Sequence, residues 1–204
     1  MTTPRRPARH FSMIRSFHLA DFFTIANGFC GMVAVFQAMA FLSTDEHWRL
    51  DAAAWLIPLA LLFDVLDGRI ARWRHQASPL GRELDSLADV ISFGVAPAAI
   101  AFAAGLDTVI DTLGLTFFAL CGLSRLARYN VTAETLSAET GKVPYFEGTP
   151  IPTSIVPLAL LMLAFHRGAL LPVQLRGFDF HLTTLVFVLS GMLMISKTLK
   201  IPKP

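Results

Sequence analysis

Charged residues and cysteines are scarce in this sequence. Only 16% of the 204 residues are charged, whereas about a quarter are charged in a typical soluble domain. With 54% hydrophobic residues and 17 phenylalanines, gathered in long apolar runs, the composition excludes an ordinary soluble domain and predicts several membrane spans. The two cysteines, Cys30 and Cys121, show neither disulfide nor metal-ligand spacing. We therefore interpret both as small buried hydrophobic residues.

The apolar runs predict an all-α membrane protein with six transmembrane helices. A helix that crosses a hydrocarbon core of about 30 Å needs roughly 20 residues. The predicted helices are residues 19–42, 52–72, 84–105, 108–127, 151–166 and 181–196. They form one membrane domain, residues 19–198. Residues 1–18 are basic and amphipathic and are predicted to lie at the membrane surface. Residues 199–204 form a cytoplasmic tail.

The basic residues fall mainly on one side of this arrangement. Of the 17 lysines and arginines, only Arg49, Arg167 and Arg176 fall in connections on the other side. Positively charged residues are enriched in cytoplasmic loops. Both termini and the stretch DVLDGRIARWRHQASPLGRELDSLAD, residues 64–89, are therefore predicted to be cytoplasmic. The long polar connection between the fourth and fifth helices lies on the same side.

Four aspartates interrupt the second and third apolar runs. Helical periodicity places Asp64 and Asp67 on one face of the second helix, and Asp85 and Asp89 on one face of the third. The Ser-Pro and glycine between them predict a turn, so the two helices would be antiparallel with their carboxylates facing. Each charge inside a membrane costs on the order of 2.5–3.5 kcal/mol on insertion scales. A cluster of four therefore requires protons or cations.

Oxygen ligands of this kind favour Mg²⁺ or Mn²⁺ over zinc, and Arg69 and Arg72 on the same helix could bind phosphate oxygens. Carboxylates, divalent metal and arginine are typical of phosphoryl transfer, with two metal ions where the geometry allows and one carboxylate as general base. The residues alone leave two alternatives open. The aspartates could pair with nearby arginines as a solvated surface network, or they could line a cation pathway.

The same stretch resembles the signature of the CDP-alcohol phosphatidyltransferase family, D-x2-D-G-x2-A-R-x8-G-x3-D-x3-D. It agrees with that pattern at every fixed position from Asp64 to Asp89. The resemblance implies six transmembrane helices, a polar cavity open to the cytosol, and a homodimer. It also implies a reaction in which an alcohol hydroxyl attacks the β-phosphorus of a CDP-linked lipid and CMP leaves.

The resemblance also implies a role for each fixed residue. Asp64 and Asp85 would contact two metal ions, Mg²⁺ or Mn²⁺, and Asp67 would complete the first. Asp89 would hold the second ion and act as the general base that accepts the hydroxyl proton. The residues implied for binding the CDP-lipid are Asn27, Gly68, Arg72, Ser78 and Gly81.

Further segments resemble the phosphatidylserine synthase branch of that family. They are SLADVISFGVAPA at 86–98, RLARYNV at 125–131, FEGTPIP at 146–152, and the pattern T-x2-N-x3-G formed by Thr24, Asn27 and Gly31. The first helix departs from the branch where LAD replaces LPN. In that branch the alcohol is L-serine, whose carboxylate needs a cation. The expected acceptor-binding residues are Arg125, Arg128 and Asn130.

The leading hypothesis is transfer of a phosphatidyl group from CDP-diacylglycerol to L-serine, with release of CMP, at the cytosolic face of a bacterial inner membrane. The expected partners are these two substrates, membrane lipid and a second copy of the chain, with no nucleic acid. One alternative is a transferase of the same family that uses choline, glycerol 3-phosphate or an inositol phosphate. The other is a cation transporter that uses the aspartates as an ion path.

Overall fold

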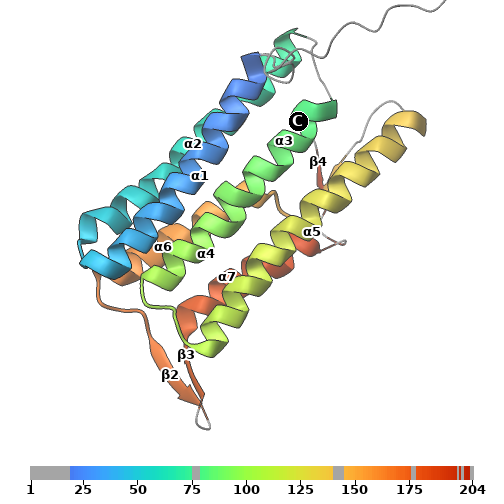
Figure 1. Cartoon of the computed structure of the whole chain (residues 1–204). Coiled ribbons are helices and arrows are strands. Elements are labelled where there is room, and N and C mark those ends of the chain that lie inside the picture. Colours follow the sequence, from blue (N-terminus) through green and yellow to red (C-terminus); the bar gives the residue numbers. More distant parts are fainter. Residues whose placement is uncertain are drawn as a thin grey trace, which may run out of the picture.

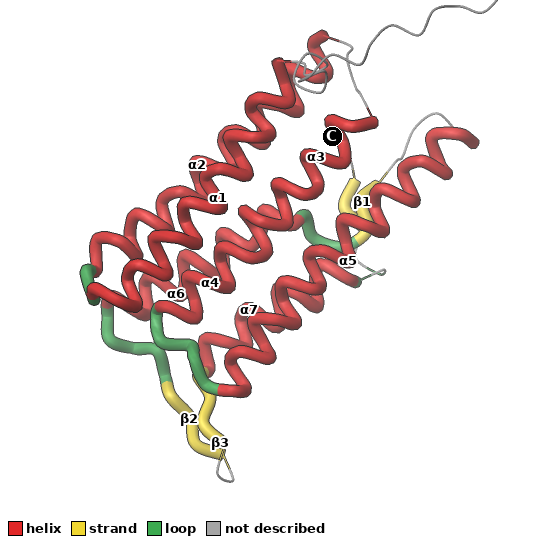
Figure 2. Tube along the Cα trace, in the orientation of Figure 1, coloured by secondary structure: helices red, strands yellow, loops and turns green. Residues whose placement is uncertain are grey.

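The structure is a computed structural model of the whole chain. It describes residues 19–74, 79–139, 145–175, 178–196, 198 and 200–202. Long helices run side by side along one direction (Figure 1), and the short strands lie at the two ends of the helical bundle (Figure 2). The predicted surface segment, residues 1–18, lies outside the described residues.

Helices occupy all six positions that the apolar runs predicted. They are α1 (Leu19–Thr44), α2 (His47–Arg74), α3 (Pro79–Asp89), α4 (Ala96–Ala103), α5 (Val109–Glu139), α6 (Ile155–His166) and α7 (Leu182–Ile195). A π-helical segment, η2 (Val90–Val95), joins α3 to α4 without a break, and a 3₁₀ segment, η3 (Ile151–Ser154), leads into α6. The third predicted span is therefore one continuous helical rod made of α3, η2 and α4.

Within the described ranges, three segments are long and apolar enough to cross a membrane: Asp21–Thr44, Leu80–Ala103 and Val109–Thr132. Two further apolar helices, α6 and α7, are shorter, and α2 carries charged residues near both of its ends. The chain is accordingly an integral membrane protein. The count of six spans stays a prediction.

Helix α5 is longer than the sequence predicted. The predicted span ended at residue 127, and the polar residues that follow were assigned to a connection. The helix instead continues to Glu139. Alanine, leucine and glutamate in its last turns are strong helix formers, so the change in polarity ends the apolar face without ending the helix.

Two short antiparallel strand pairs were not predicted. Strand β1 (Tyr145–Glu147) pairs with β4 (Lys200–Pro202), with Phe146 opposite Ile201. Strand β2 (Pro172–Leu175) pairs with β3 (Phe178–His181), with Val173 opposite Phe180. Figure 2 shows β2 and β3 projecting from one end of the bundle while β1 lies toward the other.

The start of α1, the end of α2, the start of α3 and the end of α5 gather at the end of the bundle opposite β2 and β3 (Figure 1). These are the segments that carry, or adjoin, the basic connections counted above. The described helix ends that flank those connections therefore share one end of the bundle.

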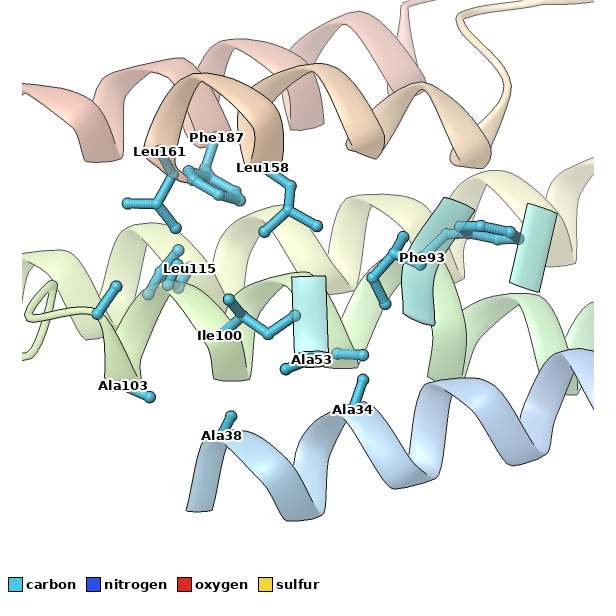
Figure 3. Close-up of a cluster of buried hydrophobic side chains, with 14 of the residues drawn as sticks. Ala34, Ala38, Ala53, Phe93, Ile100, Ala103, Leu115, Leu158, Leu161 and Phe187 are labelled. Carbon is cyan, nitrogen blue, oxygen red and sulfur yellow. The ribbon is translucent and has the colours of Figure 1, made fainter. Parts of the chain in front are cut away.

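Small residues bring the helices close together in the core. Ala34 and Ala38 of α1 and Ala53 of α2 are buried and lie among side chains from the other helices (Figure 3). Small side chains at such positions let helix backbones approach closely. Farther from α1, the rings of Phe118 in α5 and Phe187 in α7 meet edge to face, with centroids 5.3 Å apart.

A buried carboxylate, Asp111, ties α5 to strand β3 and helix α7. Its Oδ1 accepts hydrogen bonds from the backbone N–H of His181 at 3.0 Å and from the Thr184 hydroxyl at 2.6 Å. Its Oδ2 accepts from the Thr108 hydroxyl at 2.8 Å and lies 2.7 Å from His181 Nδ1. The Asp111 N–H in turn reaches Thr108 Oγ1 at 3.2 Å, which is a capping arrangement at the start of α5. This network lies at the β2–β3 end, away from the four signature aspartates.

Candidate active site

Three of the four signature aspartates converge. Asp64 and Asp67 from α2 and Asp85 from α3 each offer a carboxylate oxygen, and these oxygens lie within 4.8 Å of one another. Two oxygens on opposite sides of one Mg²⁺ lie about 4.2 Å apart, twice the metal–oxygen distance of about 2.1 Å. Small side-chain rotations therefore suffice for the three carboxylates to share a cation.

The donor set fits a divalent metal ion. Asp67 is buried and Asp64 and Asp85 are half-buried. The Oδ1 atom of Asp85 is buried without a hydrogen-bond donor among the described residues. Leaving a carboxylate oxygen buried and unpaired is costly, and a cation between the carboxylates removes that cost. An all-oxygen set of this kind prefers a hard cation.

The fourth signature aspartate, Asp89, lies one helical turn after Asp85 and outside the group of three. Its side chain is only 7% exposed. The Nδ2 group of Asn27, in α1, donates a hydrogen bond to Asp89 Oδ1 at 2.9 Å. Asn27, which the family resemblance assigns to the CDP-lipid, thus contacts a carboxylate of the site.

Helix α1 supplies a second contact that the sequence did not predict. The hydroxyl of Thr24 donates to Asp67 Oδ2 at 2.7 Å. Thr24 and Asn27 are three residues apart, so they lie on one face of α1, and both are buried. A polar pair at helical spacing inside an apolar run was the signal available in the sequence. The sequence carries no signal for their partners, Asp67 and Asp89, which lie 43 and 62 residues away along the chain.

The segment after Asp89 packs closely against α1. Here the chain widens into the π-helical η2, and such segments are frequent at functional sites. The Ser92 hydroxyl donates to the backbone oxygen of Asn27 at 2.9 Å. A Cβ atom on Gly31 would lie 2.7 Å from Ser92 Cα, so only glycine permits this approach. Asn27 and Gly31 therefore serve contacts between α1 and the helical rod that carries Asp89, while Thr24 contacts Asp67 in α2.

A buried cation lies near Asp89. Arg125 of α5 is 7% exposed, and its guanidinium is attracted by the Asp89 carboxylate. The guanidinium carbon lies 5.7 Å from the ring centre of Tyr129. Its Nε has no hydrogen-bond acceptor in the part of the chain that the structure describes. Arg125 can therefore accept an anionic group beside Asp89.

The two other residues expected for the acceptor have different neighbours. Arg128 donates to the backbone oxygen of Ile195, at the end of α7, at 3.4 Å. The Nδ2 group of Asn130 donates to the Ser86 hydroxyl in α3 at 3.0 Å.

Comparison with known protein families identifies the family of this chain. Residues 17–196 match the sequence model described as CDP-alcohol phosphatidyltransferase. The chain belongs to this family.

Three similar proteins of this phosphatidyltransferase family are named CDP-diacylglycerol–serine O-phosphatidyltransferase. The one from Saccharomyces cerevisiae is 46% identical in an alignment of 204 positions, which covers 96% of this chain and 74% of the yeast protein. The Helicobacter pylori protein (strain 26695) is 36% identical, with 86% of this chain and 68% of that protein covered. The Bacillus subtilis protein is 32% identical, with 70% and 74% covered. The family resemblance inferred from the sequence is confirmed.

The family signature also includes Gly68, and the space around this residue is open. A Cβ atom at this position would meet no heavy atom within 4 Å. Packing therefore does not demand a glycine here, although glycine inside a helix destabilises it by roughly 0.5–1 kcal/mol relative to alanine. Open space next to the aspartates leaves room for a ligand to approach the backbone of α2.

The remaining signature residues are only partly described. Gly81 lies in α3, one turn before Asp85. Arg72 lies in the last turns of α2, one turn after Gly68, but its side chain is outside the described part. Ser78 also lies outside the described residues.

Proposed function

We propose that this phosphatidyltransferase moves the phosphatidyl group of CDP-diacylglycerol to L-serine and releases CMP. The observation that carries the proposal is the buried Arg125, which lies near Asp89 and whose Nε has no hydrogen-bond acceptor among the described residues. The carboxylate of serine, which is a zwitterion, is stabilised by a buried cation beside the base. The cationic acceptor choline is repelled by it. The relatives' names and the 46% identity with the yeast protein support the same acceptor.

In the proposed reaction the serine hydroxyl oxygen bonds to the β-phosphorus of CDP-diacylglycerol. The bond from that phosphorus to the oxygen bridging the two phosphates breaks, and the bridging oxygen leaves with CMP. Asp89 accepts the hydroxyl proton as general base. Arg125 binds the serine carboxylate and so orients the hydroxyl toward the base.

Asp64, Asp67 and Asp85 are proposed to hold Mg²⁺ or Mn²⁺, with Asp89 contributing to a second ion. Such ions neutralise the charge on the diphosphate and on the departing CMP. Gly68 and Gly81, together with Arg72 and Ser78, are proposed to contact the CDP portion. The open space beside Gly68 supports that part of the proposal.

The membrane orientation is also proposed, with both termini and the aspartates on the cytosolic side of a bacterial inner membrane. The lopsided distribution of basic residues supports it. The chemistry agrees, because the lipid donor stays in the bilayer while serine and CMP are water-soluble. We further propose six spans within residues 19–198 and a homodimer, as the family resemblance implies.

The cation-transporter alternative is disfavoured by the interior of the bundle. Between the aspartates and the β2–β3 end, the described core contains fully buried hydrophobic residues such as Ile57, Ile100 and Phe118. A carrier would need polar groups along that route. The surface-network alternative is disfavoured as well, because Asp67 and Asp89 are only 6% and 7% exposed.

The acceptor is tested by CMP release from CDP-diacylglycerol in detergent micelles with Mn²⁺. Serine, choline, glycerol 3-phosphate and inositol phosphate are supplied one at a time, with water alone as the blank. We expect release with serine well above the blank and above the other alcohols. Release with choline or glycerol 3-phosphate, with serine equal to the blank, would show that the serine assignment is wrong.

A further inference from the structure

We propose that Asn27 is the positioning residue of the general base. Its amide holds the Asp89 carboxylate in the orientation that accepts the proton of the attacking hydroxyl. The proposal rests on the proposed function, because the attacking hydroxyl and the basic role of Asp89 belong to that function. It replaces the contact with the CDP-lipid that the family resemblance implied for Asn27.

The contacts of Asn27 explain why an amide stands here. The side chain is fully buried, and its Nδ2 group donates to Asp89 Oδ1 at 2.9 Å. Its own Oδ1 is buried without a donor in the described part of the chain. Burying an unpaired carbonyl oxygen destabilises a fold, whereas an apolar side chain of the same size does not. The donation to Asp89 therefore accounts for the residue type, and packing does not.

The orientation of this amide is fixed from two sides. If the amide were turned round, its Oδ1 would face the Asp89 oxygen, and two acceptors would repel each other. The backbone of Asn27 is held as well, since the Ser92 hydroxyl donates to its carbonyl oxygen at 2.9 Å. Gly31 permits that approach. The segment that follows Asp89 thus fixes the residue that holds Asp89.

Such a restraint matters for a base whose carboxylate does not belong to the group of three. Asp89 lies outside the three converging carboxylates, and the terminal torsion of an aspartate is intrinsically broad. A donor on Oδ1 limits rotation of the carboxylate. A general base must lie within hydrogen-bond reach of the proton that it removes, and misplacement by about 1 Å can lower a rate by about a hundredfold.

The test is Asn27→Leu, which keeps the size of the side chain and removes the donor. Steady-state CMP release with serine and Mn²⁺ gives kcat and the KM for each substrate. We expect kcat to fall about ten- to a hundredfold, the loss of a hydrogen bond to a charged group. The KM for CDP-diacylglycerol should match that of the wild type. The thermal unfolding midpoint should fall, because the buried Asp89 loses a donor, so kcat is measured on the folded fraction.

Two matched variants of α1 serve as controls. Cys30→Ala shortens a buried side chain one turn after Asn27, so it should lower the unfolding midpoint and leave kcat unchanged. Thr24→Val removes the donor to Asp67, which belongs to the three-carboxylate group. It should weaken binding of the Mn²⁺ ion held by Asp64, Asp67 and Asp85, measured by electron paramagnetic resonance without substrate, whereas Asn27→Leu should leave the binding of that ion unchanged.

Other results would overturn the proposal. A higher KM for CDP-diacylglycerol at unchanged kcat would assign Asn27 to the nucleotide. A lower unfolding midpoint with full kcat in the folded fraction would assign it to packing. If the wild-type protein releases no CMP with any alcohol, the proposed function fails and this inference fails with it. If only the variant behaves otherwise than expected, the inference alone is wrong.

Discussion

Replacing Gly68 by alanine should raise stability and lower activity at the same time. An alanine Cβ at this position meets no heavy atom within 4 Å, so no clash offsets the gain in helix propensity of roughly 0.5–1 kcal/mol. In a chain of this size, 1 kcal/mol corresponds to about 2–4 °C in unfolding midpoint. We therefore expect the midpoint to rise by about 1–4 °C in the absence of substrate.

The same methyl group would occupy the open space beside the aspartates, where the CDP portion is proposed to approach α2. A ligand that must move away from the backbone loses close contacts with the site. We expect the KM for CDP-diacylglycerol to rise about tenfold, which corresponds to about 1.4 kcal/mol. Differential scanning fluorimetry and steady-state CMP release measure the two effects on one preparation.

Gly114→Ala in α5 is the matched control, because it should change the midpoint in the opposite direction and leave the KM unchanged. Its Cβ atom would lie 2.6 Å from Thr184 Cγ2, so it should lower the unfolding midpoint, and the KM of the folded fraction should stay unchanged. The reasoning about Gly68 would be refuted by an unchanged KM in Gly68→Ala, which would mean that no substrate enters the space. A lower midpoint would refute it too, because the space would then not be open.

Three further predictions concern charged residues. Asp85→Asn removes a charge from the three-carboxylate group, so Mn²⁺ binding measured by electron paramagnetic resonance should weaken at least about tenfold; unchanged binding would place the metal elsewhere. Arg125→Gln should raise the KM for serine about ten- to a hundredfold, because a charged hydrogen bond to the serine carboxylate is lost. The KM for CDP-diacylglycerol should stay unchanged. Equal changes in both KM values would contradict a role of Arg125 in acceptor binding. Asp111→Ala deprives His181, Thr184 and Thr108 of their common acceptor. It should lower the free energy of unfolding by about 3–5 kcal/mol, while the folded fraction keeps its kcat. A loss of kcat with full stability would show that this network takes part in the reaction.

The sequence was sufficient for features that depend on local spacing. Asp64 and Asp67 lie three residues apart, and Asp85 and Asp89 four apart, so helical periodicity alone places each pair on one face. The Ser-Pro turn between the helices then implies that the faces meet, and the convergence of three of these carboxylates agrees with that implication. The six helical segments followed from apolar runs for the same reason.

Contacts between distant segments could not be predicted in this way. The partners of Asn27 and Thr24 lie 62 and 43 residues away, and His181 lies 70 residues from Asp111. No periodicity links such positions, because the contacts depend on how whole helices pack. The pattern T-x2-N-x3-G drew attention to α1, but its meaning followed only from the position of α3 and η2 beside it.

Helical spacing alone does not determine the contacts of Arg125 and Arg128. The sequence suggested that Arg125 and Arg128 could share one pocket, because residues three apart are neighbours on a helix. They still differ by about 60° around the helix axis, given 3.6 residues per turn. Arg128 donates to the backbone oxygen of Ile195 in α7, whereas Arg125 lies near Asp89, and a pocket shared by the two arginines stays a prediction.

Transfer of labelled serine into lipid tests the central proposal most directly. Purified protein in micelles of CDP-diacylglycerol and detergent receives radiolabelled L-serine and Mn²⁺, and the lipid phase and the released CMP are measured together. The proposed function predicts one labelled phosphatidylserine for each CMP, with both products lost in Asp89→Asn. CMP release at the same rate without serine, with no label in the lipid phase, would contradict it.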